Sequence, residues 1–206
     1  SVKTSKKKET VCRVNILANT NQLSLYDCMK GMEEDNFRIN LVQVRESIIN
    51  ELANNVSDSF CVATPSALLK FFIPSLLPEC EKILYLDGDI LVKEDLTELY
   101  ETNIEDVYGA VVTDSGKLYS GRKIVKEIPN YFNSGMMLLN TRRMGEIVDQ
   151  LIEVKAHQLD KSLMDQDVFN QVIAENVINL PIKYNFLYTN LNRAKNHYSM
   201  QNLNQL

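Results

Sequence analysis

The sequence contains no tryptophan, only two histidines and four cysteines among its 206 residues. The cysteines are far apart and form no Cys-x-x-Cys pair, so neither a zinc ribbon nor a disulfide framework is indicated, and we expect free, mostly buried thiols. No stretch approaches the ~18 consecutive apolar residues of a membrane span, and the N-terminal segment is too polar for a signal peptide. We therefore expect a cytoplasmic chain, with peripheral contact with the inner membrane face left open.

Positive charge is also scarce. The 22 Lys and Arg residues are outnumbered by 27 Asp and Glu residues, and the formal net charge is −5. No broad basic field is therefore available for nucleic acid. The one basic cluster, Lys3 with residues 6–8, is interpreted as the solvated face and end of a short helix followed by a turn.

Short apolar runs alternate with stretches of helical spacing, which is typical of an α/β domain with strands covered on both faces. The predicted strands are residues 11–17, 37–44, 82–86, 107–113, 134–140 and 177–182. The predicted helices are residues 23–32, 47–54, 65–73, 142–159 and 166–174. No repeat, linker or low-complexity tract marks a second domain, so residues 1–206 are expected to form one domain.

The most informative segment is a buried strand that runs straight into two aspartates. Residues 83–86 are apolar and precede Asp87, Gly88 and Asp89, and ligands of open α/β sheets bind beyond the carboxyl ends of such strands. In extended backbone the two carboxylates point the same way, where they repel unless a cation or a proton neutralises them. The pair therefore suggests a hard divalent metal with oxygen ligands.

The Asp-x-Asp spacing is weak evidence by itself. With 12 aspartates in the chain, chance alone gives about 0.7 such patterns. In a second pattern, Asp165-Gln166-Asp167, the first aspartate can serve as a helix N-cap and the other as a favourable residue of the first turn. Asn133 has an equally plain alternative as a turn residue.

Three motifs that follow one another along the chain support a functional interpretation of the Asp-x-Asp spacing. They are Tyr85-Leu-Asp-Gly-Asp-Ile-Leu-Val92, Tyr131-Phe-Asn-Ser-Gly135 with the Leu-Leu-Asn that follows, and Asp165-Gln-Asp-Val-Phe-Asn170. In order and spacing they resemble the glycosyltransferase family 8 proteins. The resemblance covers nearly the whole chain and includes Ile73-Pro74, Asp114 and Tyr184-Asn185-Phe186.

The resemblance implies both a fold and an activity. The fold is a GT-A-type nucleotide-diphospho-sugar transferase, with a Rossmann-like mixed sheet and helices on both faces. The activity is metal-dependent transfer of glucose or galactose, with retention of configuration, from a UDP-sugar to a glycan or lipid-linked acceptor. Enzymes of this kind contribute to bacterial cell-surface polysaccharide.

The same resemblance assigns residues to the site. Asp87 and Asp89 correspond to the pair that holds Mn²⁺ or Mg²⁺ against the donor diphosphate, with Asp87 also near the nucleoside. The residues expected to line the sugar pocket are Asp114, Asn133, Asp165 and Gln166. Of these, Asp165 would accept hydrogen bonds from sugar hydroxyls and Gln166 would lie near the anomeric carbon, so both are candidate catalytic residues.

Lys70 and the chain ends depart from the family pattern. Lys70 stands where the family usually has arginine, and lysine keeps the positive charge without the bidentate fork for phosphate. The family's nucleoside-binding first strand has no counterpart, nor does its C-terminal His-x-x-Gly-x-x-Lys-Pro-Trp stretch, which supplies a third metal ligand. His157 and His197 lack that context and are interpreted as surface residues.

These departures leave a second function open. Without the first strand, the strands at residues 11–17 and 82–86 would have open edges that invite pairing with another chain, for example in a homodimer. The chain would then bind UDP weakly, stay catalytically silent and act as a binding or assembly module. The adjoining reading frame distinguishes this hypothesis from the enzyme. A phosphatase with an aspartyl nucleophile would need further acidic and lysine motifs that are missing here.

Overall fold

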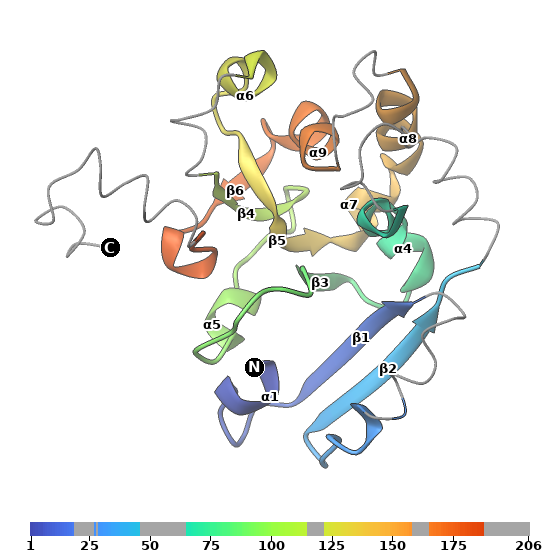
Figure 1. Ribbon diagram of the computed structural model, residues 1–206. Helices are drawn as coiled ribbons and strands as arrows, with labels where there is room; N and C mark the ends of the chain where they lie inside the picture. Colours follow the sequence, from blue (N-terminus) through green and yellow to red (C-terminus); the bar gives the residue numbers. More distant parts are fainter. Residues whose placement is uncertain (19–26, 28, 46–64, 115–121, 158–164, 188–206) are drawn as a thin grey trace, which may run out of the picture.

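The computed structural model describes residues 1–18, 27, 29–45, 65–114, 122–157 and 165–187. Within these residues the strands form two sheets (Figure 1). β1 (Cys12–Ala18) and β2 (Phe37–Gln43) form a parallel pair. The second sheet has the order β3 (Lys82–Leu86), β5 (Phe132–Asn140), β4 (Gly109–Thr113), β6 (Val177–Asn179). Its first two pairings are antiparallel and the β4–β6 pairing is parallel, so this sheet is mixed.

All six predicted strands are present; β3 has the predicted bounds, and the others are shifted at one or both ends. β5 begins earlier than expected, at Phe132, and β4 begins later, at Gly109. The predicted strand at residues 177–182 is wrong in its second half, because β6 ends at Asn179 and the chain turns at Pro181 into the short helix η4 (Ile182–Tyr184). Proline has no amide hydrogen to donate to a sheet, which explains why the strand stops before it.

The helices follow the predicted positions with breaks inside them. Residues 65–73 form the 3₁₀ helix η2 (Pro65–Phe72), which continues into α4 (Ile73–Leu76). The helix predicted at residues 142–159 is divided into α7 (Thr141–Gly145) and α8 (Val148–His157), and α9 (Asp165–Ile173) follows. The helix at residues 47–54 and half of that at residues 23–32 (residues 23–26 and 28) lie outside the described residues.

Three helices of four or five residues complete the description. α1 (Val2–Ser5) agrees with the short N-terminal helix that the sequence predicts. α5 (Thr97–Tyr100) and α6 (Lys123–Glu127) were not predicted, because an element of one turn carries too little hydrophobic periodicity to be recognised. In the part of the chain that is described, no helix is long and apolar enough to cross a membrane.

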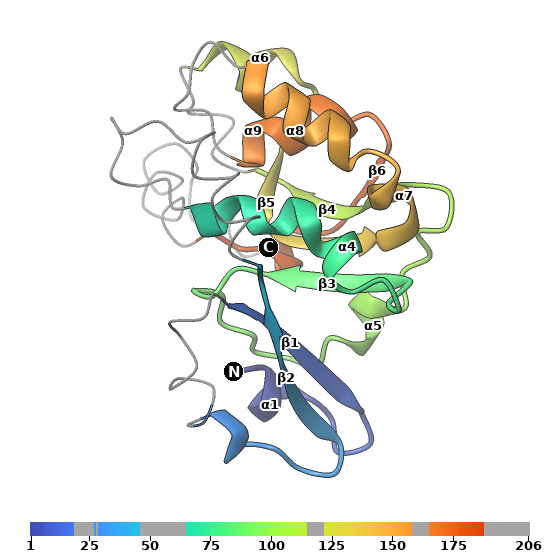
Figure 2. The same cartoon turned by 90° about the vertical axis from the view of Figure 1, so that its right-hand side faces the viewer.

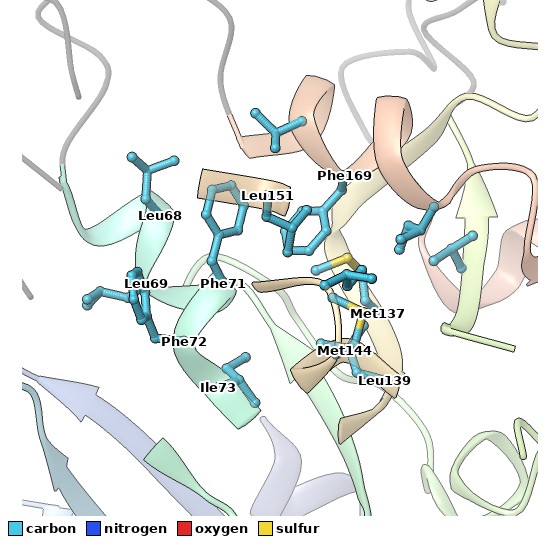
Figure 3. Packing of buried hydrophobic residues seen from close by; sticks show 14 of the residues in the cluster. Leu68, Leu69, Phe71, Phe72, Ile73, Met137, Leu139, Met144, Leu151 and Phe169 are labelled. Atoms are coloured by element: carbon cyan, nitrogen blue, oxygen red, sulfur yellow. The ribbon is translucent and has the colours of Figure 1, made fainter. Parts of the chain in front are cut away.

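Both faces of β5 are buried, which fixes its place in the middle of the mixed sheet. Met137 and Leu139 face the main core, where η2, α4, α8 and α9 pack (Figure 3). In that core the rings of Phe71 and Phe169 meet edge to face, with centroids 5.0 Å apart. Met136 and Leu138 belong to two smaller clusters. Figure 2 shows α8 and α9 together on one side of the sheet.

Gly109 shows how tightly β4 is fitted against β5. A Cβ atom added at this position would lie 2.3 Å from the backbone oxygen of Leu138. We expect Gly109→Ala to lower the free energy of unfolding by about 1–3 kcal/mol, because strand backbone has to move. Urea denaturation measures this loss. Gly145→Ala is the control, since its added Cβ would have Pro74 Cβ at 3.6 Å, an ordinary contact, and its stability should be unchanged or higher.

Two further sequence predictions concern thiols and strand edges. Cys12 and Cys80 are free and partly buried, while Cys28 and Cys61 lie outside the described residues. Among the residues that are described, β1 pairs with β2 alone and β3 with β5 alone. Pairing of these edges with another chain stays a prediction.

Candidate functional site

The three sequence motifs meet at one end of the mixed sheet. β3 and β5 are antiparallel, so the carboxyl end of β3 lies beside the first residues of β5. The amide of Asp87 donates to the carbonyl of Gly135 at 2.8 Å. The first turn of α9 reaches the same place, where Gln166 accepts a hydrogen bond from Asn133 Nδ2 at 2.9 Å. The end of β4 adds Asp114, whose carboxylate accepts from Gln166 Nε2 at 2.9 Å.

An irregularity in the sheet shapes this end of β5. Val111 pairs with Met137, but the next residue, Val112, pairs with Asn133. Such bulges change the direction of side chains and are frequent beside functional sites. Here the residues between the two pairings include Ser134 and Gly135, which contact the other two motifs.

Asn133 is both a turn residue and a contact between segments. Its Oδ1 accepts from the amide of Gly135 at 3.0 Å, which is the local hydrogen bond expected of a turn asparagine. The same atom accepts from Asn185 Nδ2 at 2.8 Å. Its Nδ2 reaches Gln166, so the plain turn interpretation describes only part of its contacts.

Asp87 and Asp89 lie in a turn rather than in a strand. β3 ends at Leu86, and the carbonyl of Asp87 accepts from the amide of Ile90 at 3.2 Å. The assumption that extended backbone directs both carboxylates the same way is therefore wrong. Aspartate and glycine favour turns, and Gly88 provides both flexibility and space, since a Cβ added there would meet nothing within 4 Å.

Tyr85 holds one oxygen of Asp87. Its hydroxyl donates to Asp87 Oδ1 at 2.7 Å. Burial, this hydrogen bond and the charges of the nearby aspartates, Asp89 among them, raise the pKa of the Tyr85 phenol well above its usual range. The phenol therefore stays protonated and remains a donor to Asp87 across the physiological pH range.

Lys70 is the buried cation of the site. Its side chain is 3% exposed, and its Nζ lies 2.7 Å from Asp165 Oδ2 and 3.5 Å from Asp87 Oδ1. The ammonium also stands 4.6 Å from the centroid of the Tyr85 ring. Lys70 thus joins the turn after β3 to the start of α9 through carboxylates, a set of contacts that the sequence did not reveal.

Asp165 and Gln166 make contacts across the site. Asp165 is the first residue of α9 and is 6% exposed, and its Oδ2 accepts from Ser134 Oγ at 2.7 Å in addition to the Lys70 ion pair. Capping of its own helix therefore does not account for its contacts. Gln166 Oε1 also accepts from the amide of Ser134 at 3.2 Å.

Asn170 is a positioning residue that the sequence analysis missed. It is 2% exposed, its Oδ1 accepts from the amide of Phe132 at 2.7 Å, and its Nδ2 donates to the carbonyls of Phe132 and Gln166, both at 2.8 Å. These bonds hold α9 against the start of β5. The available signal was a polar residue one turn after Gln166, next in sequence to the apolar residues Val168 and Phe169.

The turn that carries Asp87 and Asp89, called the acidic turn below, provides part of the ligand set of a hard cation. Asp87 Oδ2 faces Gly135, where an added Cβ would lie 2.9 Å from that oxygen, so the missing side chain leaves room beside it. Asp89 is exposed. No group of three or more His, Cys, Asp or Glu side chains that could hold a metal occurs among the described residues. Two carboxylates suit Mg²⁺ or Mn²⁺, which complete their coordination with phosphate and water oxygens. His157 is exposed on α8, and His197 lies outside the described residues.

A protein-family model and curated relatives were compared with this chain. The model described as Glycosyl transferase family 8 matches residues 4–205. Lipopolysaccharide 1,2-glucosyltransferase of Escherichia coli is 37% identical over 121 residues, covering 53% of this chain and 35% of that enzyme. Glycosyltransferase GlyF of Streptococcus pneumoniae is 31% identical over 125 residues, covering 59% of this chain and 29% of GlyF. The alignments thus span about a third of these relatives.

Solved structures show the same fold. The galactosyltransferase LgtC, in complex with donor and acceptor sugar analogues, has a TM-score of 0.66 at 18% identity and covers 92% of this chain and 80% of its own. An active-site mutant of LgtC, with glutamine replaced by glutamate, has a TM-score of 0.67 at 17% identity, with coverages of 92% and 79%. Mouse xyloside xylosyltransferase 1 has a TM-score of 0.63 at 18% identity, with coverages of 88% and 76%. The predicted GT-A-type fold is therefore confirmed.

Proposed function

The chain belongs to glycosyltransferase family 8, and we propose that it transfers a hexose, glucose or galactose, from a UDP-sugar to a glycan or lipid-linked acceptor. The observation that carries this proposal is the convergence of Asp87, Asn133, Asp165 and Gln166, from three motifs, at one end of the sheet. Carboxylates and amides gathered at a strand end are the groups that orient a polyhydroxylated ligand.

In this proposal Asp87 and Asp89 hold Mn²⁺ or Mg²⁺ next to the donor diphosphate. Tyr85 donates to Asp87 Oδ1 and orients it, and Oδ2 lies next to Gly135, where there is no side chain. When bound, the cation supplies positive charge that stabilises the departing phosphate. Lys70 offsets part of the negative charge that the aspartates bring to the site.

The sugar then lies against Asp114, Asn133, Asp165 and Gln166. Sugar hydroxyls both donate and accept, so they can bond to the carboxylates and to the amide of Asn133. An amide is a poor nucleophile, and we therefore favour attack by the acceptor on the face that the phosphate leaves. The acceptor oxygen bonds to the anomeric carbon as the carbon–phosphate oxygen bond breaks, and the acceptor's proton passes to the departing phosphate. Configuration is retained.

A donor and product assay tests this function. The full-length protein is incubated with UDP-glucose or UDP-galactose, Mn²⁺ and glycan or lipid-linked acceptors, and UDP release and product configuration are measured. We expect acceptor-dependent UDP release with a retained anomeric centre. An inverted product would exclude same-face attack, and no turnover with either donor would exclude the proposed hexose transfer in favour of a binding role.

Gly135→Ala is expected to damage the site more than the fold. The added Cβ would lie 2.9 Å from both Asp87 Oδ2 and Asn133 Oδ1, so each of these side chains has to move away from it. A displacement of this size within the site should lower turnover by about a hundredfold. Steady-state kinetics measure the loss, and Gly145→Ala again serves as the control. Turnover within twofold of the unchanged protein would contradict the placement of these two side chains around the donor.

A further inference from the structure

The amide of Gln166 is bound on both ends by residues of the site. Nε2 donates to Asp114 Oδ2 at 2.9 Å and to the hydroxyl of Tyr131 at 3.3 Å. Oε1 accepts from Asn133 Nδ2 and from the amide of Ser134. Both amide hydrogens and two acceptor directions are therefore in use. Of these partners, Tyr131 leads into a second set of polar contacts, which includes Asp167 and Arg122.

That second set runs from Tyr131 to the protein surface. The Tyr131 hydroxyl donates to Asp167 Oδ1 at 2.6 Å, and Arg122 Nη2 lies 2.6 Å from Asp167 Oδ2. Tyr131 and Asp167 are each 1% exposed, whereas the Arg122 side chain is 49% exposed. The chain Arg122–Asp167–Tyr131–Gln166 thus passes from solvent into the site.

The number of hydrogens determines the direction of each bond. A carboxylate paired with arginine only accepts, so Tyr131 must give its single hydroxyl hydrogen to Asp167. Toward Gln166 the phenol oxygen can then only accept. The phenol oxygen can therefore accept a hydrogen bond from the Nε2 end of the amide. If the Oε1 end faced the phenol instead, two hydrogen-bond acceptors would lie against each other. Because Asp167 and Tyr131 are buried, no solvent competes for these bonds, and the preference is strong.

We infer that Arg122, Asp167 and Tyr131 are positioning residues that fix the orientation of the Gln166 amide. Tyr131 and Asp114 hold Nε2, which turns Oε1 toward Asn133 and the start of β5. Arg122 pairs with the Asp167 carboxylate, and this carboxylate accepts the phenol hydrogen of Tyr131 and so keeps it away from Gln166. The inference deepens the proposed function, on which it rests for the role of Gln166 beside the sugar.

Kinetics of Tyr131→Phe and Asp167→Asn test this role. Each variant removes the constraint on the amide, so a flipped amide becomes accessible. We expect kcat for hexose transfer to fall about tenfold while KM for the donor stays within twofold, because the ground-state contacts of the donor are largely kept. Tyr100→Phe is the matched control, since Tyr100 also donates through its hydroxyl, to the carbonyl of Lys82, away from the site. Its kinetics should be unchanged.

A double-mutant cycle separates positioning from a merely structural contribution. In a Gln166→Ala background there is no amide to orient, so adding Tyr131→Phe should lower kcat by less than twofold. A full tenfold loss in that background would overturn the inference, because the phenol would then act by another route. Arg122→Gln provides a second cycle with a half-exposed residue, in case Tyr131→Phe is not folded.

The amide itself can be observed without any turnover. In protein labelled with ¹⁵N-glutamine, the side-chain resonance of Gln166 is identified by its loss in Gln166→Ala. We expect slow hydrogen exchange at this amide in the unchanged protein and in Tyr100→Phe, and exchange at least tenfold faster in Tyr131→Phe. Equal exchange rates would refute the positioning role. If transfer is absent but exchange behaves as expected, the proposed function fails while the positioning of Gln166 stands.

Discussion

Asp89→Asn is expected to lower hexose transfer by about a hundredfold, a loss of a few kcal/mol of transition-state stabilisation. Asp89 is exposed in the turn after β3, where its carboxylate is available to a cation that Asp87 alone would hold weakly. Asparagine keeps the shape and an oxygen ligand but removes the charge that a hard divalent cation requires. UDP-sugar turnover at saturating Mn²⁺ measures the loss. Chelation should abolish turnover of the unchanged protein, and added Mn²⁺ should restore it.

Asp106→Asn is the matched control for this variant. Its side chain is fully exposed at 100%, and its partner is Arg143 at 3.8 Å, outside the site. Both variants should unfold at the same urea concentration as the unchanged protein, because exposed carboxylates contribute little to stability. Asp89→Asn with undiminished turnover would remove Asp89 from the cation site and with it the role proposed for the acidic turn.

The convergence of the site could be predicted because each motif follows or begins a recognisable strand or helix. The apolar run at residues 83–86 ends in Asp87, and the apolar run of β5 begins after Asn133. An antiparallel pairing of those strands brings both ends together, and the structure has this pairing. The role of each residue in binding or catalysis stays a proposal, since it depends on a ligand that the fold alone does not supply.

The partners of Lys70 could not be predicted from the sequence. Lys70 precedes Asp165 by 95 positions (165 − 70), and a lysine near the end of a short helix usually faces solvent. Its burial results from the packing of η2 against α8 and the mixed sheet, a tertiary effect with no local periodic signal. The turn at Asp87 was missed because extended backbone was assumed to continue through the two aspartates beyond the strand at residues 82–86.

The polar contacts that join Gln166 to Tyr131, Asp167 and Arg122 could not be predicted from the sequence either. Asp167 was interpreted as favourable in the first turn of a helix, which is consistent with its place in α9. Its partners Tyr131 and Arg122 come from the position before β5 and from the position before α6. Sequence reasoning on one helix cannot identify such partners, because hydrogen-bonded pairs of distant residues follow from the fold.

Lys70→Met is expected to cost about 3–5 kcal/mol of the free energy of unfolding. Methionine fills a similar volume, so packing is largely kept, but the ammonium between Asp165 and Asp87 is lost. Asp165 is 6% exposed, and its carboxylate would remain buried with Ser134 as a neutral partner. Urea denaturation followed by circular dichroism measures the change. Lys123→Met, on an exposed pair with Glu127, should change stability by less than about 0.5 kcal/mol.

The cause of that loss can be tested by removing the carboxylate as well. If the cost comes from an uncompensated buried charge, adding Asp165→Asn to Lys70→Met should restore part of the lost stability, because the amide is neutral and still accepts from Ser134. If the cost comes from packing instead, the second change should add to the first. Lys70→Arg completes the series: it keeps the charge, and a stability close to that of the unchanged protein would show that the cation is what this buried position requires. A stable Lys70→Met would instead contradict this account, since it would mean that the Asp165 carboxylate, 6% exposed in the structure, reaches solvent when the lysine is removed.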